Sequence, residues 1–380
     1  MNNPYKSLFL LDPNTTHLNH GSFGACPRPI FDSLISWQKK LEFNPTKHLA
    51  VDIYNYLETS RKSLSNYIHC NQDDIVFFPN PSTALNTVIK SLDLKPDDEI
   101  LTTNHEYGAL DKTWNFICKK TGAKYIKQNI TLPLESRDSF IKTFTKGLTN
   151  KTKVIFISHI TSSTGLIFPV EEVCEIAKEN GIFCIIDGAH VPGHIPLNIK
   201  KLNPDIYTGA CHKWMCAPKG TSFLYAKREI QNDIDPLVVS WGYESEMPSH
   251  SQFLDYHQWQ GTNDLSAYLT IPDVINFLDV NDWITVSNRC HEINIEAREM
   301  VNHCLNQNPI SNNEFIGQMS SIKIRCKDPF ELQKVFYNEY KIIIPVFEWN
   351  NEMFLRFSIQ AYNSIEDIEK LVFAIKKINL

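Results

Sequence analysis

A lysine set among small and apolar residues is the side chain in this sequence best suited to covalent chemistry. Lys213 follows the stretch Ala210–His212 and precedes Trp214, so its neighbours do not form a polar surface. Most lysines are solvated surface charges. A desolvated lysine loses its proton more readily and can form a Schiff base. Lys213 is therefore a candidate nucleophile.

An aspartate stands at the end of a strongly apolar run. Asp187 follows residues 182–186, and His190 comes three residues later. Ligands of open parallel sheets bind at the carboxyl ends of the strands. One interpretation is a simple helix N-cap, and another is a carboxylate that keeps a ring nitrogen protonated, with His190 bonding nearby. A metal site made of Asp187, His190 and His194 is a third alternative, weakened by the lack of a strict ligand spacing.

The segment Asn80–Thr83 lies between a predicted strand and a predicted helix. Free N–H groups and the positive end of the helix dipole favour an anion there, so Ser82 and Thr83 are candidate phosphate donors. Ordinary capping of the helix is the alternative. No Walker loop occurs, and no GxGxxG follows a strand, which argues against ATP and nicotinamide.

His105 begins a segment that resembles the zinc-binding pattern HExxH. Its fifth position is Ala109, so that pattern is excluded. Tyr107 lies just beyond a predicted strand, where it either stacks on a flat ring or serves as a core aromatic.

The elements that position these residues alternate between strands and helices. Continuous rather than alternating hydrophobicity in two of the strands indicates that both faces of the sheet are covered, which is typical of a parallel sheet in an α/β fold. The predicted strands cover 74–78, 99–103, 153–159, 182–187 and 221–225, and the predicted helices cover 83–92, 109–121 and 171–180.

The pattern changes after about residue 265, in a way that suits a smaller α+β domain. We expect a large domain over 15–265 and a small C-terminal domain over 266–380, with residues 1–14 associated with the latter. The expected elements are helices at 266–279, 283–306 and 329–339, strands near 316–325, 341–346 and 353–358, and a last helix that begins after Ser364.

The composition is that of an ordinary globular protein. Of 380 residues, 42% are hydrophobic and 21% charged, the net charge is -6, and mean hydropathy is -0.27. No basic block predicts nucleic-acid binding, no apolar run approaches a membrane span, and no leader pattern begins the chain. The ten scattered cysteines predict reduced thiols. We therefore expect a cytoplasmic protein.

The order of these signals is more specific than any one of them. The sequence resembles the class V aminotransferase family of pyridoxal-phosphate enzymes, and within it the isopenicillin N epimerase-like proteins. The stretches that carry the resemblance are THLNHGSFGACPRP (16–29), NPSTALNTV (80–88), HEYGALDKTW (105–114), SHITSSTGLIFPV (158–170), IIDGAHVPG (185–193), CHKW (211–214), QGTNDLSAY (260–268) and FLRFSIQAYNSIEDI (354–368).

The resemblance implies an aspartate-aminotransferase fold of type I, with a mostly parallel seven-stranded large domain, and pyridoxal 5'-phosphate as cofactor. Lys213 would then form the internal aldimine, Asp187 would pair with the pyridinium nitrogen, and His190 would contact the phenolic oxygen. Tyr107 takes the place of the family's usual stacking histidine, and Ser162 replaces a common asparagine in the cofactor site.

The resemblance also implies how phosphate and substrate are held. Ser82, Thr83 and His212 would bind the phosphate, and Thr262 would reach the phosphate of the neighbouring subunit in a homodimer with shared active sites. On the substrate side, Arg356 would bind the α-carboxylate through its planar fork. His20 is a further candidate for the substrate pocket, with His48 and Trp241 as weaker ones.

The implied activity begins with an external aldimine, from which Lys213 removes the α-proton to give a carbanion. Epimerisation or racemisation of an amino acid is our first expectation. A C–S lyase that acts on a cysteine conjugate or sulfoxide is the alternative, followed by an aminotransferase. Persulfide-forming desulfurases carry a cysteine shortly before the carboxylate arginine, and residues 341–355 contain none, which disfavours that activity. Asp187 and Lys213 together argue against a cofactor-free interaction protein.

Overall fold

A mostly parallel sheet of seven strands forms the centre of the computed structural model, which describes residues 3–380. The strand order is β2-β8-β7-β6-β5-β3-β4, and β8 runs antiparallel to both of its neighbours. The predicted α/β fold with its mostly parallel seven-stranded sheet is thereby confirmed. The strands are β2 (Ile75–Phe78), β3 (Glu99–Thr103), β4 (Lys124–Gln128), β5 (Thr152–Ser158), β6 (Phe183–Asp187), β7 (Ile206–Ala210) and β8 (Ser222–Ala226).

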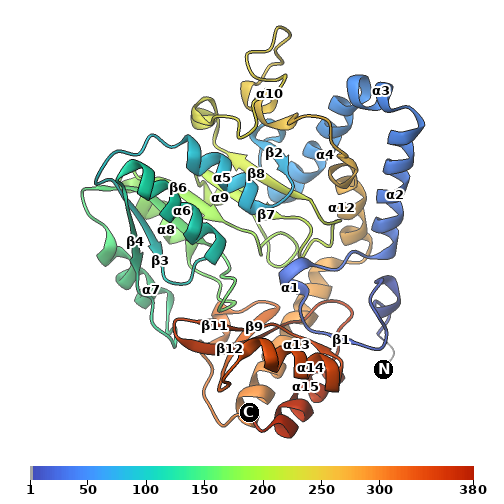
Figure 1. Ribbon diagram of the computed structural model, residues 1–380, viewed down its shortest axis with the longest axis vertical. Helices are drawn as coiled ribbons and strands as arrows, with labels where there is room; N and C mark the ends of the chain where they lie inside the picture. Colours follow the sequence, from blue (N-terminus) through green and yellow to red (C-terminus); the bar gives the residue numbers. More distant parts are fainter. Residues whose placement is uncertain (1–2) are drawn as a thin grey trace.

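Helices cover both faces of this sheet (Figure 1). Because side chains alternate along a strand, Val154 and Phe156 of β5 pack with α5 and α6, whereas Ile155 and Ile157 pack on the opposite side with α8. This burial of successive residues explains the continuous apolar runs in the sequence. The helices around the sheet are α4 (Ile53–Ile68), α5 (Pro81–Ser91), α6 (Gly108–Thr121), α7 (Arg137–Phe144), α8 (Val170–Glu179), α9 (Ile199–Leu202) and α10 (Gln252–Gln258).

A second, antiparallel sheet has the strand order β11-β12-β9 and lies with α13, α14 and α15 at the bottom of Figure 1. Its strands are β9 (Met319–Ile324), β11 (Val346–Trp349) and β12 (Glu352–Ser358). The remaining helices are α1 (His20–Phe23), α2 (Arg28–Phe43), α3 (Pro45–Lys47), α11 (Ser266–Leu269), α12 (Ile271–Val280), α13 (Trp283–Cys304), α14 (Pro329–Tyr340) and α15 (Ile365–Ile378).

The N-terminal segment joins this second sheet region. Strand β1 (Thr16–His17) pairs in parallel with β10 (Ile342–Ile343). The expected single strand over 341–346 is wrong in detail, because Pro345 has no N–H to donate and the chain continues as a separate strand, β11. The domain division at residue 265 stays a prediction, and residues 1–2 of the segment 1–14 lie outside the described residues.

The first turn of α5 begins two residues earlier than the sequence pattern suggested. The Asn80 side chain accepts a hydrogen bond from the Thr83 N–H at 2.8 Å, so Asn80 is the N-cap and Pro81 opens the helix. Ser82 and Thr83 therefore lie on the first helical turn. Over residues 3–380, no helix combines the length and apolar character that crossing a bilayer requires.

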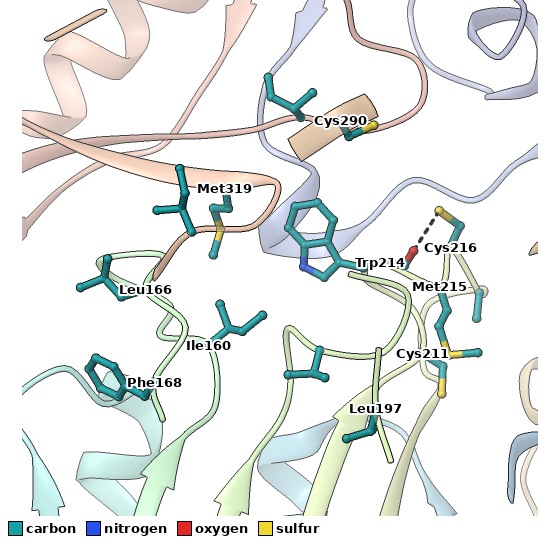
Figure 2. Packing of buried hydrophobic residues seen from close by; sticks show 14 of the residues in the cluster. Ile160, Leu166, Phe168, Leu197, Cys211, Trp214, Met215, Cys216, Cys290 and Met319 are labelled. Carbon is teal, nitrogen blue, oxygen red and sulfur yellow. Dashed lines mark hydrogen bonds between the residues drawn. The ribbon is translucent and has the colours of Figure 1, made fainter. Parts of the chain in front are cut away.

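Trp214 lies in the core where the two sheet regions meet. Figure 2 shows its indole among Ile160, Met319 and Cys290, which come from three separate segments. The side chain is fully buried. This packing fixes the loop that carries Lys213.

Candidate active site

A cavity of about 520 Å³ lies at the carboxyl ends of the parallel strands, bordered by the first turns of α5 and α6 and by strand β12. Its place agrees with the general rule for open α/β sheets. The residues predicted from the sequence that line it are Ser82, Tyr107, Ser162, Asp187, His190, His212, Lys213 and Arg356.

The Lys213 amine points toward His190. Its Nζ lies 3.1 Å from Nε2 of His190, and the side chain is enclosed by protein. Burial lowers the pKa of Lys213 to about 8, opposed by the nearby charge of Asp187 and assisted by that of Arg356. The amine is therefore much closer to its neutral, nucleophilic form at pH 7 than an ordinary lysine.

Asp187 ends strand β6 directly beside the last residue of β5. Ser158 and Asp187 are register partners, so their side chains leave the sheet on the same face and both line the cavity. The Asp187 Oδ1 accepts the N–H of Ala189 at 2.9 Å. Burial raises the pKa of Asp187, which gives this carboxylate a strong preference for a cationic partner.

The N-terminus of α5 opens onto the cavity. Asn80, Pro81 and Ser82 line it, whereas Thr83 does not. The Thr83 hydroxyl donates to the Asn80 side chain at 3.0 Å. Asn80 therefore caps the helix, whereas Ser82 faces the cavity, where its role in binding an anion stays a prediction.

Tyr107 and His212 approach the cavity from two other loops. Tyr107 is 45% exposed and precedes the first residue of α6, so its ring is not a core aromatic. The Nδ1–H of His212 donates to the carbonyl of Thr221 at 2.8 Å. Burial lowers the pKa of His212 to about 4.

Arg356 brings a buried cation to the cavity from strand β12. Its guanidinium donates to the carbonyl and hydroxyl of Ser162 and, at 2.8 Å, to the hydroxyl of Ser22. Its Nε has no partner in the described structure. Burial lowers the pKa of Arg356 to about 10, and no carboxylate neutralises it among its hydrogen-bond partners. An anionic ligand would meet this unbalanced charge.

His20 and Thr262 lie outside the cavity lining. The His20 ring is fully buried, and its Nε2–H donates to the carbonyl of Lys213 at 2.9 Å, which makes it a support for the main chain of the loop. Thr262 is exposed in the segment before α11. Its contact with a neighbouring subunit stays a prediction.

Sequence reasoning missed three polar contributors to the site. Ser22 and Ser158 line the cavity, and Glu106 is buried beneath it. The Glu106 carboxylate accepts from the Thr103 hydroxyl at 2.7 Å and from the Ser158 N–H and hydroxyl at 2.8 and 2.6 Å. Burial raises the pKa of Glu106 to about 7, and the nearby charge of Asp187 adds to this rise. A carboxyl three residues after the end of strand β3 was the only signal in the sequence.

The chemistry of the donor set fits pyridoxal phosphate. One cavity presents an amine with a lowered pKa, a buried carboxylate for a ring nitrogen, a half-exposed aromatic ring and a helix N-terminus for a phosphate. Within residues 3–380, no group of three or more His, Cys, Asp or Glu side chains is arranged to hold a metal ion.

Comparison with known proteins agrees with this geometry. A model of the family Aminotransferase class-V matches residues 27–371. The chain is 29% identical to isopenicillin N epimerase from Amycolatopsis lactamdurans, over 97% of this chain and 96% of that protein. It is 25% identical to hercynylcysteine sulfoxide lyase from Schizosaccharomyces pombe, over 98% and 96% of the two chains. The apo structure of a cysteine desulfurase from Thermococcus onnurineus NA1 superimposes with a TM-score of 0.85 at 19% identity, covering 100% of this chain and 98% of that one.

Proposed function

Because this chain belongs to the aminotransferase class-V family and is a pyridoxal-phosphate-dependent enzyme, we propose that it acts at the α-carbon of an amino acid as an epimerase or racemase. The observation that carries the proposal is the meeting of Lys213, Asp187 and Arg356 in one buried cavity. An amine, a carboxylate and a guanidinium are the groups that this chemistry needs.

When bound, pyridoxal phosphate supplies an electrophilic carbon for the substrate amine and a cationic ring that accepts the electron pair of a broken bond. Lys213 would hold the cofactor and afterwards accept the α-proton at its Nζ. Asp187 would keep a proton on the ring nitrogen, and the Nε2–H of His190 would donate to the phenolic oxygen. These roles use the burial that lowers the pKa of Lys213 and raises that of Asp187.

Phosphate and substrate would be held by different elements around the cavity. Ser82 and the free N–H groups of the first turn of α5 suit the phosphate, with His212 beside them. Arg356 would exchange its contacts with Ser162 and Ser22 for the two oxygens of the substrate α-carboxylate. Holding the carboxylate fixes which bond at the α-carbon is broken.

A C–S lyase is the second candidate, and similarity to the sulfoxide lyase favours it. Such a reaction needs the same α-proton removal, followed by loss of a β-sulfur group. No cysteine lines the cavity among the described residues, which disfavours a persulfide-forming desulfurase. Transamination would instead return the proton to the cofactor.

The products of candidate amino acids distinguish these reactions. We expect α-hydrogen exchange with inversion and no pyruvate from the epimerase, whereas pyruvate would support the lyase and a keto acid matched by aminated cofactor would support the aminotransferase. Lys213→Ala is the control that should abolish all three. Failure of every amino acid to exchange its α-hydrogen would contradict the proposal.

We also propose a cytoplasmic homodimer, in which Thr262 of each subunit would reach the phosphate site of the other. Apolar side chains are exposed near that segment, with Trp241 87% and Met247 90% accessible in a groove beside α4 and α10. The ten free cysteines suit a reducing compartment. A chain that sediments as a monomer while it turns over substrate would contradict the shared site.

A further inference from the structure

Trp214 contacts His190 through the one polar atom of its indole ring. Its Nε1–H donates to Nδ1 of His190 at 3.3 Å, and both side chains are buried. An indole N–H is only a donor, so Nδ1 of His190 must present its lone pair. In a neutral imidazole the single proton then sits on Nε2.

The opposite nitrogen of the same ring faces the lysine. His190 Nε2 lies 3.1 Å from Nζ of Lys213. Since Nε2 carries the proton, the hydrogen bond runs from His190 to the amine. An ammonium group has three donors and no acceptor, so only the neutral amine can receive this bond. The direction of one indole hydrogen bond therefore favours the neutral form of the Lys213 amine.

The charges around His190 agree with a neutral ring. Burial holds the pKa of His190 well below its usual range. Repulsion from nearby positive or titratable groups on several elements lowers this pKa further. Asp187 supplies the opposing charge beside Lys213. The groups that act on His190 are Lys213, Arg356 on β12, His194 in the same loop and His212 next to the lysine.

A second buried histidine, His194, contacts both His190 and Trp214. The main-chain N–H of Gln318 donates to Nε2 of His194 at 2.6 Å, so the Nδ1–H of His194 donates to the carbonyl of His190 at 2.9 Å. The His194 ring lies against the Trp214 indole with centroids 4.0 Å apart. In Figure 2 the indole nitrogen of Trp214 points away from Cys216, and the ring is enclosed by the surrounding core side chains. The indole is fully buried in this core.

We propose that Trp214 is a positioning residue that holds His190 as its Nε2–H tautomer and thereby favours the neutral form of the Lys213 amine, which is the form that reacts with an aldehyde. This inference rests on the proposed roles of Lys213 and His190. It adds that the residue following the lysine prepares the lysine for reaction before the cofactor arrives. The same Nε2–H is also the donor that the phenolic oxygen would need.

The histidine tautomer can be measured directly in the cofactor-free protein. Nitrogen-15 NMR of histidine-labelled protein, with the His190 signal assigned through its loss in His190→Asn, should show protonation at Nε2. In Trp214→Phe, which keeps an aromatic ring but removes the N–H, the Nδ1–H tautomer should become populated. Trp114→Phe is the matched control, because Trp114 is equally buried and its N–H has no hydrogen-bond partner.

The consequence for the amine is a change in the rate at which added pyridoxal phosphate is taken up. Loss of one net hydrogen bond predicts about fivefold slower uptake near neutral pH in Trp214→Phe, with the midpoint of its pH profile moved upward by about half to one unit. Trp114→Phe should match the wild type.

A wild-type His190 protonated at Nδ1 would overturn this inference even if Trp214→Phe did not fold. Unchanged tautomer and uptake in a folded Trp214→Phe protein would overturn it as well. A wild-type protein that takes up no pyridoxal phosphate would instead contradict the proposed function, while the tautomer measurement would still decide the role of Trp214.

Discussion

The guanidinium of Arg356 donates to the hydroxyl of Ser22 at 2.8 Å, which joins residues 334 positions apart in the sequence at the wall of the cavity. Ser22 belongs to the short helix α1, and Arg356 to strand β12. The same guanidinium also donates to Ser162, in the loop after β5. Three distant segments therefore meet on one planar cation.

Arg356→Lys should lower kcat/KM by about tenfold to a hundredfold, mainly through KM. A lysine retains the charge but loses the two parallel donors that a carboxylate requires, and a charge-assisted hydrogen bond contributes about 1.5–3 kcal/mol. Steady-state kinetics with the identified amino acid measures this effect. Ser22→Ala, which leaves the guanidinium intact, should cost much less. Equal losses in the two variants would show that Arg356 acts only as a structural link.

Gly24→Ala should destabilise the loop that carries Lys213. Gly24 has φ +69°, and a Cβ there would lie 1.9 Å from the carbonyl oxygen of His212. The strained backbone and the forced shift together should lower the free energy of unfolding by about 2–5 kcal/mol and weaken cofactor uptake.

Gly181→Ala is the control for this effect, because Gly181 has φ +63° and its Cβ would meet nothing within 4 Å. It should lose only about 1–2 kcal/mol, with normal cofactor uptake. Denaturant unfolding measures the free energy of unfolding of both variants and so separates backbone strain from the steric clash with His212. Equal losses in the two variants would contradict the contact between residue 24 and the His212 carbonyl.

Glu106 should make stability depend on pH. Burial raises the pKa of Glu106 from its ordinary value of 4.5 to about 7, so the folded state retains this proton while the unfolded chain releases it. Stability from this group is present below pH 4.5 and is lost as pH rises toward 7. The free energy of unfolding that Glu106 contributes at low pH and loses at high pH is on the order of 3 kcal/mol.

Glu106→Gln lacks this titration. The free energy of unfolding of the variant, relative to wild type, should therefore rise between pH 4 and pH 8. Urea unfolding at several pH values measures the difference, in which the other titrating groups cancel. A difference that stays constant, or falls with pH, would contradict the raised pKa.

Most of the parallel sheet could be predicted from sequence, because β5 and β6 are buried on both faces and appear as continuous apolar runs. Strand β4 was missed, since it is an edge strand whose residues Lys124 and Lys127 are exposed and leave no apolar pattern. The break at Pro345 was also missed. Strand β7 (Ile206–Ala210) was not predicted either, although all five of its residues are buried, because Thr208 and Gly209 interrupt its apolar run.

The site was predictable where a residue type stands at the end of a recognisable element. Asp187 ends a strand, and Lys213 lies in an unusually apolar segment, so the sequence could mark both as candidates. Ser22 and Ser158 carry no such signal, because a serine acquires its role only from a partner far away in the chain. The tautomer of His190 is likewise invisible in the sequence, since it depends on the direction in which the indole of Trp214 points.

Reduction of the purified protein with borohydride after addition of pyridoxal phosphate tests the assignment of Lys213 most directly. The reduced cofactor should be bound covalently to the peptide that contains Lys213, and the visible absorption of the bound pyridoxal phosphate should disappear. Lys213→Ala should contain no covalently bound cofactor. Attachment to another lysine, such as the nearby Lys219, would contradict the account.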